Sequence, residues 1–364
     1  MRKDSNYMKM ALGLPRRGLG VTWPNPAVGC VIIDGLGHVV GRGFTGRGGR
    51  PHAETQALAQ AGDAAQGAVA YVTLEPCAHH GKTPPCAESL IKAKVGRVVV
   101  ATGDPDSRVS GRGLKMLEQA GIQVDFGVCQ TEAKQVNQGF FQKISQKKPL
   151  VTIKIASSLD GKTATASGQS KWITGSESRQ RGHLLRANHD AIMVGVGTVM
   201  ADDPSLDCRL PGLEDWSPVR IIVDSHLTMP ESCKLLETAK KIPTWVVTTT
   251  SDGPKFEALK NKGAKLITCA ANKEGRVDLT RMMELLAEEG ITRLLCEGGA
   301  QVNASLIRAS LVDRLYWFRS SGVIGGDGLS ALGSTGLDEL KKMPNFVHVR
   351  TGQTGNDIWQ EFII

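Results

Sequence analysis

The most informative run of this 364-residue chain is Thr73-Leu-Glu-Pro-Cys-Ala-His-His-Gly-Lys-Thr-Pro-Pro-Cys86. It holds two Pro-Cys pairs, which end at Cys77 and Cys86, and Pro51-His52-Ala-Glu lies upstream of it. Together His52, Cys77 and Cys86 offer one ring nitrogen and two thiolates. Three protein ligands, with a fourth position left for water, are typical of a catalytic zinc site. The pattern therefore predicts that these residues bind Zn2+.

Glu54 follows His52 by two residues, near enough to reach a water in the fourth position without binding the metal. A carboxylate there can accept a proton from the water and deliver it to a ring nitrogen and to departing ammonia. His-x-Glu followed by Pro-Cys is the general signature of zinc deaminases, so we expect hydrolytic deamination with Glu54 as the catalytic residue. Two alternatives stay open: a structural zinc site with His79 or His80 as fourth ligand, and two ordinary buried cysteines.

Helical and strand-like patterns alternate around this run. We expect strands at 27–33, 38–40, 68–74, 97–102 and 123–126, and helices at 4–14, 52–61, 88–94 and 113–120. Strands separated by helices of this length imply an α/β domain whose sheet is covered on both faces.

A polar, basic stretch from Gln142 to Pro149 is typical of a linker, and the α/β alternation restarts beyond it. We expect strands at 150–156, 191–194, 219–223, 244–249 and 293–296, and helices at 176–187, 281–289 and from residue 300. Residues 1–150 hold 19 Lys and Arg against 11 Asp and Glu, whereas the remainder holds 25 of each. The sequence therefore predicts two domains, 1–147 and 148–364, and the net charge of +8 belongs to the first.

The composition excludes several classes of protein. Charged residues make up 22% and hydrophobic residues 41%, which is ordinary for a globular chain and unlike a disordered or fibrous one. No run approaches the roughly 18 apolar residues of a membrane span, and the N-terminus lacks the apolar segment of a secretory signal. Eight scattered cysteines do not form a disulfide scaffold, so we expect a reducing cytoplasm. The basic balance favours a phosphate-bearing partner, nucleic acid included.

Glycine-rich motifs follow apolar strands in the second domain. Val194-Gly-Val-Gly-Thr198 and Glu297-Gly-Gly-Ala300 would let a cofactor approach the backbone, and the second opens a helix whose N-terminus suits a phosphate. Each alone fits a tight turn equally well, but two in one α/β domain favour a nucleotide cofactor. Gly41-Arg-Gly-Phe-Thr-Gly46 also spells G-x-G-x-x-G, yet no helix opens there. We therefore predict a glycine-rich active-site loop at 41–46 and no dinucleotide site.

The spacing of the cysteines points to one group of deaminases. Eight residues separate Cys77 from Cys86, whereas deaminases of nucleosides and of tRNA usually have two. With this spacing the run 73–86 closely resembles the pyrimidine deaminase of riboflavin biosynthesis. Asn25-Pro-Ala-Val-Gly29 and Asp104-Pro-Asp beside Gly111-Arg-Gly113 are similar to the same family.

This resemblance implies roles for further residues. Asn25 would contact the pyrimidine, and Glu75 and the His79–Lys82 loop would line the pocket. The chain departs from the family at Thr45 and Gln56, where His is common, so the contacts of the 41–50 loop are not implied.

The second domain resembles the reductase of the same pathway. The resemblance is carried by Lys154-Ile-Ala-Ser-Ser-Leu-Asp-Gly-Lys, Ser170-Lys-Trp-Ile-Thr-Gly175, Leu185-Arg-Ala, Asp190–Leu206 and Glu297-Gly-Gly-Ala. It implies that NADPH is held by Ala156, Trp172, Thr198, Asp202, Ser225, Gly298 and Gly299. It implies that substrate is held by Ser170, Arg186, Leu206, Arg209 and Glu297. Arg186 and Arg209 have a physical case of their own, because guanidinium groups bind phosphate bidentately, although solvated surface arginines remain an alternative. Asp160 suits a turn before Gly161 equally well.

The resemblance spans almost the whole chain, in the deaminase-then-reductase order of the bacterial bifunctional enzyme. It implies a cytidine deaminase-like three-layer αβα domain followed by a dihydrofolate reductase-like α/β domain, with Zn2+ and NADPH as cofactors. The first would deaminate 2,5-diamino-6-(5-phosphoribosylamino)pyrimidin-4-one, and the second would reduce the ribosyl group of the product to ribityl. The expected partner is then a small pyrimidine ribose phosphate, with no nucleic acid or membrane partner. A homo-oligomer is left open.

Two other functions compete with this one. The basic first half would suit a nucleic-acid or nucleoside base deaminase with an accessory nucleotide-binding domain. Against it, aromatic residues are only 5% of the chain and no Lys/Arg run interleaves with stacking residues. The other is a zinc-stabilised binding module without catalysis, in which Glu54 would have no chemical role.

Overall fold

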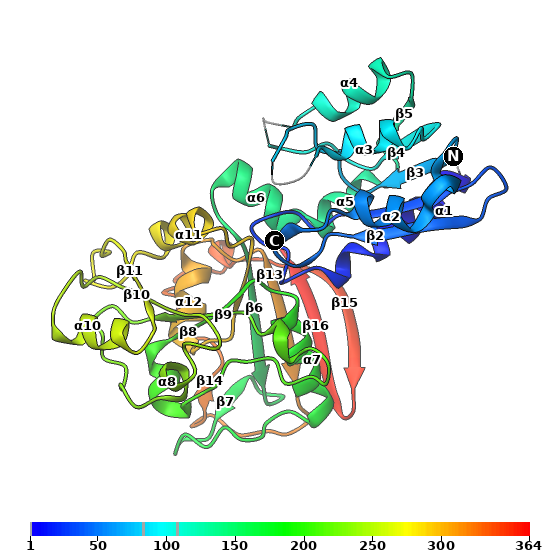
Figure 1. Cartoon of the computed structure of the whole chain (residues 1–364). Coiled ribbons are helices and arrows are strands. Elements are labelled where there is room, and N and C mark those ends of the chain that lie inside the picture. The colour runs from blue at the N-terminus through cyan, green and yellow to red at the C-terminus, as the bar shows by residue number, and fades with distance from the viewer. Residues whose placement is uncertain (1, 82–83, 107–108) are drawn as a thin grey trace. The chain divides into compact units, whose positions relative to one another are not determined.

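The computed structural model describes residues 2–81, 84–106 and 109–364. The chain divides into two units, Met1–Lys147 and Lys148–Ile364, each with its own sheet and buried core (Figure 1). Within the described ranges, no helix is both long enough and apolar enough to cross a membrane.

The first unit is built on a five-stranded sheet in the order β2-β1-β3-β4-β5. β1 is antiparallel to both of its neighbours, whereas β3, β4 and β5 are parallel to one another. The strands are β1 (Gly29–Ile33), β2 (Val39–Phe44), β3 (Val69–Val72), β4 (Arg97–Val100) and β5 (Gln123–Phe126).

Helices cover both faces of this sheet. Along β1, Cys30 and Ile32 pack into a cluster with α2, α3 and α4, whereas Val31 and Ile33 pack into another with α1 and α5. Successive strand residues point to opposite faces, so the alternation reports one helical layer on each side. The predicted three-layer αβα domain is confirmed. The helices are α1 (Arg2–Gly13), α2 (Ala53–Ala61), α3 (Cys86–Lys92), α4 (Arg112–Gln119), α5 (Gln130–Val136) and α6 (Gln138–Gln146).

The glycines of the 41–46 segment serve packing. Gly41 and Gly43 lie in β2, and a Cβ on either would stand 2.2 Å from a backbone oxygen of α2, at Ala57 and Ala53 respectively. Only glycine lets strand and helix approach this closely. The prediction of an active-site loop was therefore wrong for these two residues, whose side of the strand is covered by α2.

The expected linker at 142–149 is largely helical, because α6 continues to Gln146 and Lys147 ends it with a φ of 54°. Gln and Lys are good helix formers, so a polar composition does not separate a linker from an exposed helix. Only residues 147–149 connect α6 to the first strand of the second unit.

The second unit holds a nine-stranded sheet in the order β11-β10-β9-β8-β12-β6-β13-β16-β15. Its strands are parallel up to β13, while β16 is antiparallel to both β13 and β15. Its strands are β6 (Leu150–Ser157), β8 (Ala191–Gly195), β9 (Val219–Val223), β10 (Thr244–Thr248), β11 (Lys265–Thr268), β12 (Arg293–Cys296), β13 (Arg314–Arg319), β15 (Val347–Thr354) and β16 (Asp357–Ile363). A separate pair joins β7 (Lys162–Ala164) to β14 (Leu329–Ser330).

Helices α7 (Ser176–Ala187), α8 (Val196–Asp202), α9 (Lys234–Glu237), α10 (Pro254–Asn261), α11 (Leu279–Glu288) and α12 (Ala300–Arg308) connect and cover this sheet. Short 3-10 helices of both units lie at Pro15–Arg17, Arg47–Gly49, Gly62–Ala65, Glu214–Trp216 and Leu340–Lys342. The predicted strands and helices of this unit are all present. β7, β11, β13, β14, β15 and β16 were not predicted. Most side chains of β15 are exposed, so its sequence lacks the alternation of a half-buried strand.

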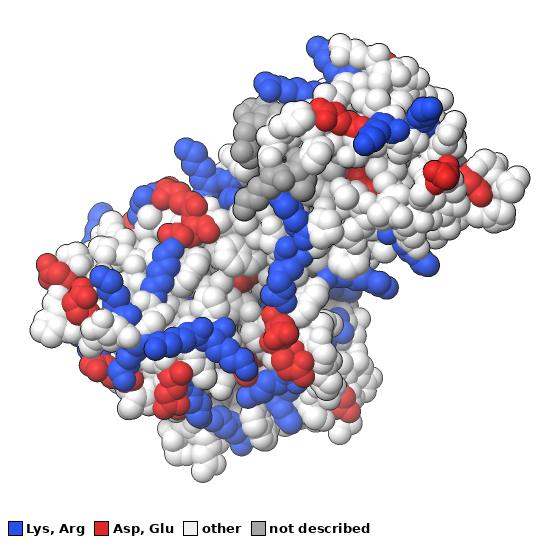
Figure 2. Space-filling view, in the orientation of Figure 1, with Lys and Arg blue, Asp and Glu red and all other residues white. Residues whose placement is uncertain are grey.

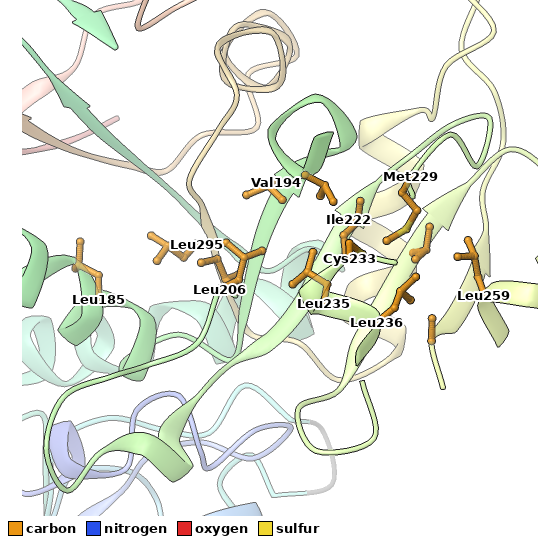
Figure 3. Close-up of a cluster of buried hydrophobic side chains, with 14 of the residues drawn as sticks. Leu185, Val194, Leu206, Ile222, Met229, Cys233, Leu235, Leu236, Leu259 and Leu295 are labelled. Atoms are coloured by element: carbon orange, nitrogen blue, oxygen red, sulfur yellow. The ribbon is translucent and has the colours of Figure 1, made fainter. Parts of the chain in front are cut away.

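The core of the second unit gathers side chains from β8, β9, β12 and the segments that cover them (Figure 3). β8 is buried along its whole length, which is typical of a central parallel strand. Leu206 belongs to the same core cluster as Leu295, and its backbone φ is 52°. Its side chain therefore stabilises the core, and its backbone shapes the segment that follows α8.

Charges on the second unit are mixed. On the face shown in Figure 2, Lys and Arg are interspersed with Asp and Glu over this unit, in agreement with the equal numbers of basic and acidic residues after residue 150. A single-sign surface is not visible on that face.

Candidate active sites

The three predicted zinc ligands come from three segments of the first unit. His52 precedes α2, Cys77 lies after β3, and Cys86 is the first residue of α3. Their ligand atoms all lie within 4.8 Å of one another. His52 Nδ1 is 3.1 Å from Cys86 Sγ and 3.6 Å from Cys77 Sγ. Ligand atoms around a tetrahedral zinc stand roughly 3.5–3.8 Å apart, so the arrangement fits Zn2+.

The chemistry of the thiols also suits a metal. The backbone N–H of Cys86 donates to Cys77 Sγ at 3.3 Å. Hydrogen bonds from Cys86, followed by His52, lower the pKa of the Cys77 thiol to about 4. Zinc binds the thiolate form, and this environment favours it.

Glu54 lies in the first turn of α2 with 4% of its surface exposed. Burial, together with the neighbouring Cys77 thiolate, raises the pKa of its carboxyl to about 7. Glu54, His52, Cys77 and Asn25 line one cavity of about 220 Å³. The structure therefore brings the predicted catalytic carboxyl, two of the three predicted ligands and a predicted substrate contact to a single cavity, whose lining does not include Cys86.

A four-ligand structural site has little support. Among the described residues, the close group of ligand atoms comprises His52, Cys77 and Cys86. His80 Nε2 is instead 2.8 Å from Glu88 Oε1, and His79 lines the cavity.

The positions that depart from the family pattern bond to the backbone. Thr45 lines the cavity, and its Oγ1 accepts a hydrogen bond from Val28 N at 2.8 Å. Gln56 donates to the carbonyl oxygen of Phe44. Asn25 Nδ2 donates to Gly48 O at 3.1 Å, and a Cβ on Gly49 would stand 2.3 Å from that nitrogen. Glycine at 49 therefore makes room for Asn25 at the cavity.

Glu75 lines the same cavity, but its carboxylate is engaged by the chain. Its oxygens accept hydrogen bonds from Gly111 N at 3.0 Å and Gly113 N at 3.1 Å. A Cβ on Gly113 would stand 2.0 Å from the carbonyl oxygen of Pro76, which explains the glycine of this motif. Lys82, the last residue of the predicted lining loop, falls outside the described residues.

In the second unit the two glycine motifs meet. β8 and β12 are parallel neighbours, so their carboxyl ends lie at one edge of the sheet, where α/β proteins bind ligands. Gly195 N donates to Gly298 O at 3.0 Å. The hydroxyl oxygen of Thr198 would be 3.3 Å from a Cβ on Gly299. The structure thus brings three predicted cofactor residues, Thr198, Gly298 and Gly299, into one place.

A cavity of about 760 Å³ opens at this edge and follows one face of α12. Gly195, Ser225 and residues of the 272–280 segment line it. Its volume falls within the usual range for cofactor sites. Of the seven predicted cofactor residues, Ser225 lines this cavity. The other six are not among its lining residues: Ala156, Trp172, Thr198, the exposed Asp202, Gly298 and Gly299.

Arg186 and Glu297, both predicted to hold substrate, pair with each other. Arg186 Nε donates to Glu297 Oε1 at 2.7 Å, and a second guanidinium nitrogen donates to Oε2 at 2.9 Å. Lys154 Nζ lies 4.0 Å from the same carboxylate. Burial alone would raise the pKa of Glu297, but Arg186 and Lys154 outweigh it and lower that pKa to about 2. The carboxylate is therefore ionised, and binding of phosphate by the Arg186 guanidinium stays a prediction.

Arg209 lies beside His183, a residue without a predicted role. Arg209 N donates to His183 Nδ1 at 3.3 Å, and its guanidinium is 3.4 Å from His183 Nε2. Burial, followed by Arg186 and Arg209, lowers the pKa of His183. The Arg209 side chain lies 3.7 Å from the Asp207 carboxylate. Because 59% of this side chain is exposed, its guanidinium is still accessible to an anion.

Ser170 and Trp172 line a smaller cavity of about 260 Å³ with Ser158. The Trp172 ring is 68% exposed and stacks on the Arg179 guanidinium at 4.4 Å. Asp160 accepts hydrogen bonds from Ser158 Oγ and from the backbone N–H groups of Ile324 and Gly325. It therefore tethers a distant segment, a role that its place before Gly161 did not indicate.

Comparison with known proteins agrees with both sites. Residues 1–102 match the cytidine and deoxycytidylate deaminase zinc-binding region, and residues 149–359 match the RibD C-terminal domain. The riboflavin biosynthesis protein RibD of Aquifex aeolicus is 42% identical over 355 residues, which cover 98% of this chain and 97% of that protein. The chain belongs to the RibD family.

Structures of RibD proteins extend the similarity to the fold. RibD of Acinetobacter baumannii, form 1, has a TM-score of 0.89 and 37% identity, covering 100% of this chain and 99% of the other. The deaminase/reductase of Thermotoga maritima has a TM-score of 0.87 and 32% identity with the same coverage. RibD of Escherichia coli K12 is 38% identical over 367 residues, covering 98% of each chain.

As a RibD-family member, this chain is a bifunctional deaminase and reductase, and the predicted α/β fold, activities and cofactors are confirmed. The roles of individual residues stay predictions. Sequence reasoning missed Lys154 and His183 as members of the charged cluster. A signal existed for Lys154, since it is the one charged residue in the apolar strand Leu150–Ser157.

Proposed function

We propose that this chain catalyses two successive steps of riboflavin biosynthesis. The first is zinc-dependent hydrolytic deamination of 2,5-diamino-6-(5-phosphoribosylamino)pyrimidin-4-one, and the second is NADPH-dependent reduction of the ribosyl group of the product to ribityl. The observation that carries the proposal is that one chain holds a His-Cys-Cys ligand group beside a buried glutamate and a glycine-lined cavity at a parallel sheet edge. The related Thermotoga maritima protein is a diaminohydroxyphosphoribosylaminopyrimidine deaminase and 5-amino-6-(5-phosphoribosylamino)uracil reductase, which supports the same pair of activities here.

In the first unit His52, Cys77 and Cys86 would hold the zinc ion. Bound there, the metal supplies Lewis acidity that makes a water molecule acidic near neutral pH. The Glu54 carboxylate accepts a proton from the attacking water and delivers it to the pyrimidine nitrogen. It then accepts the second proton, from the hydroxyl group added to the ring, and delivers it to the amine, which leaves as ammonia. Asn25, held by its hydrogen bond to Gly48 O, orients the pyrimidine in the cavity of about 220 Å³.

In the second unit the cofactor residues named above would hold NADPH, which supplies the hydride. Glu297 is kept ionised by Arg186, so its oxygens accept hydrogen bonds from hydroxyl groups of the sugar. The accessible guanidinium of Arg209 binds the substrate phosphate. Leu206 has its side chain in the core, so it contributes through its backbone, whose φ is 52°. Catalysis here is mainly a matter of holding the sugar carbon against the nicotinamide.

A coupled assay on the full chain tests both steps. Incubated with the diaminopyrimidine ribotide, zinc and NADPH, the protein should release ammonia and then consume NADPH in equal amounts. NADPH consumption should fail when the deaminated intermediate is absent. Ammonia release without any NADPH consumption would overturn the reductase half of the proposal.

The competing base-deaminase function is tested with single-stranded oligonucleotides. We propose a small-molecule partner because the candidate cavity of the first unit has a volume of only about 220 Å³. Measurable deamination of cytosine or adenine in single strands, with none of the ribotide, would favour the alternative. We also assign the chain to the cytoplasm, a location supported by eight cysteines that are all free thiols.

A further inference from the structure

We propose that Arg276 and Arg308 bind the 2'-phosphate of NADPH and make this chain prefer NADPH to NADH. The inference rests on the proposed reductase function, because it concerns the far end of the cavity assigned to the cofactor. Neither arginine belongs to a motif by which the sequence predicted the site.

The cavity extends along α12, so its two ends can contact different parts of a bound dinucleotide. Gln301, Val302, Ser305 and Arg308 line it at the three- and four-residue spacing that places side chains on one helix face. With a rise of 1.5 Å per residue, Arg308 lies about 10 Å along α12 from Gln301. The glycine turns at Gly195 and Gly298 are near the start of this helix, so Arg308 marks the opposite end.

Arg276 reaches the same cavity from a turn that is fixed in place. The side-chain oxygen of Asn272 accepts hydrogen bonds from Glu274 N at 2.9 Å and Arg276 N at 3.0 Å. The next residue, Val277, donates its N–H to Ser225 Oγ at 3.0 Å. Ser225 is a predicted cofactor residue, so the turn that carries Arg276 is hydrogen-bonded directly to the candidate cofactor site.

Two acidic residues of the cavity are held by hydrogen bonds from the backbone. Asp224 accepts hydrogen bonds from Thr228 N and Met229 N, and Asp278 caps α11 by accepting from Thr280 N and Arg281 N; these contacts are made with the backbone. They hold both carboxylates against their own loops.

The guanidinium groups remain accessible. Glu274 is 3.9 Å from Arg276, with both side chains more than 60% exposed, and such a pair contributes little. Arg308 donates to Ser305 Oγ at 3.1 Å and has no ion-pair partner within residues 2–81, 84–106 and 109–364. His226 also lines the cavity and adds a ring that can donate a hydrogen bond.

Two guanidinium groups from separate elements match a phosphate dianion, because each can donate two parallel hydrogen bonds to its oxygens. NADH has a hydroxyl group at this position, which offers no charge to the arginines. The geometry therefore discriminates between the two dinucleotides at the adenosine end, away from the hydride.

Binding of the dinucleotides to the full-length protein tests the proposal without turnover. Titration calorimetry would compare NADPH, NADH and adenosine 2',5'-bisphosphate for the unmodified chain, Arg276→Ala and Arg308→Ala. Each variant should bind NADPH and the bisphosphate about tenfold or more weakly, as expected for a lost charge-assisted hydrogen bond. NADH binding should change less than twofold. Lys273→Ala removes a positive charge from the same turn outside the cavity lining and should leave all three affinities unchanged.

Other outcomes separate the two proposals. Equal losses for NADPH and NADH would mean that the arginines contact the adenine or the pyrophosphate, and would overturn the inference. Unchanged NADPH binding in both variants would overturn it as well. If the unmodified chain binds none of these compounds, the reductase function itself fails.

Discussion

The two candidate sites are assembled in different ways. The candidate deaminase site consists of His52, Glu54, Cys77 and Cys86, which lie within 35 positions of sequence. The reductase site depends on contacts such as Arg186 with Glu297, which are 111 positions apart. The candidate deaminase site depends on side chains that belong to a short sequence motif. The candidate reductase site depends on backbone turns and ion pairs that form only once the sheet has formed. A metal site can therefore be recognised locally, and a positioning site cannot.

Removal of zinc should separate the sites most completely. Treatment with a chelator should reduce deamination to the uncatalysed rate, because the three ligands have no other way to activate water. NADPH binding by the second unit should be unaffected. Ammonia release and NADPH titration on the same sample measure both, and added Zn2+ should restore the deaminase. Loss of NADPH binding along with the zinc would contradict the independence of the two sites.

Glu54→Gln should produce the next largest effect. The amide cannot carry the proton, so deamination should fall by about 10²–10⁴-fold, as for other general acid–base residues. Zinc content, measured by atomic absorption, should be unchanged because Glu54 is not a ligand.

Glu118→Gln, on the exposed face of α4, is the matched control and should behave like the unmodified chain. A binding module without catalysis would show no effect for either variant. A loss of zinc in Glu54→Gln would instead make Glu54 a structural residue.

Glu297→Gln should show that the reductase site depends on a buried ion pair. The change leaves Arg186 without its partner, and breaking a buried pair costs about 3–5 kcal/mol. Five of the six tryptophans lie beyond residue 148, so tryptophan fluorescence during urea unfolding reports mainly on the second unit. Deamination should persist.

The control for this variant is Glu288→Gln, which removes an exposed contact with Arg281. It should change the free energy of unfolding by about 0–1 kcal/mol. Equal effects of the two substitutions would show that the Arg186–Glu297 pair is no more than a surface contact.

His189 should make the stability of the second unit depend on pH. Burial, followed by Arg293, lowers the pKa of this histidine to about 3, while its Nδ1 and Nε2 contact Leu185 O and Thr152 Oγ1. Between pH 3 and its ordinary pKa near 6.5 the unfolded chain binds a proton that the folded chain does not. The free energy of unfolding should therefore fall with decreasing pH in this window, by up to roughly 1.4 kcal/mol per pH unit.

His189→Gln should remove that slope while lowering stability at neutral pH. Urea titrations of the second-unit fluorescence at several pH values measure the slope. An identical slope in the variant would assign the acid sensitivity to other groups, Glu297 among them, whose lowered pKa acts below its ordinary value of 4.5.

Much of the first unit follows from local sequence. Hydrophobic runs and breaks located its five strands to within a few residues, and the alternation along β1 matches two helical layers. The misreadings have a common cause. Gly41 and Gly43 look like a loop until α2 packs on them, and the polar α6 looks like a linker. In both cases the sequence of the segment does not show which other parts of the fold pack against it.

In the second unit, the sequence predicted the five neighbouring parallel strands from β10 to β6 and missed the strands on either side of them. β8 is apolar throughout and was predicted, whereas β15 is mostly exposed and was not. Leu206 shows the same limit at the scale of one residue, since only packing reveals that its side chain enters the core.

The sequence alone predicted the zinc ligands and the carboxylate beside them, and it determined the glycine motifs and the family, because each depends on residue type and short spacing. Tertiary structure decided which charges meet. It paired Arg186 with Glu297, attached Asp160 to Ile324 and Gly325, and brought Arg276 and Arg308 to one cavity from separate elements. The physical reason is that these contacts depend on the order of strands in the sheet, and strand order is set by burial of the whole core.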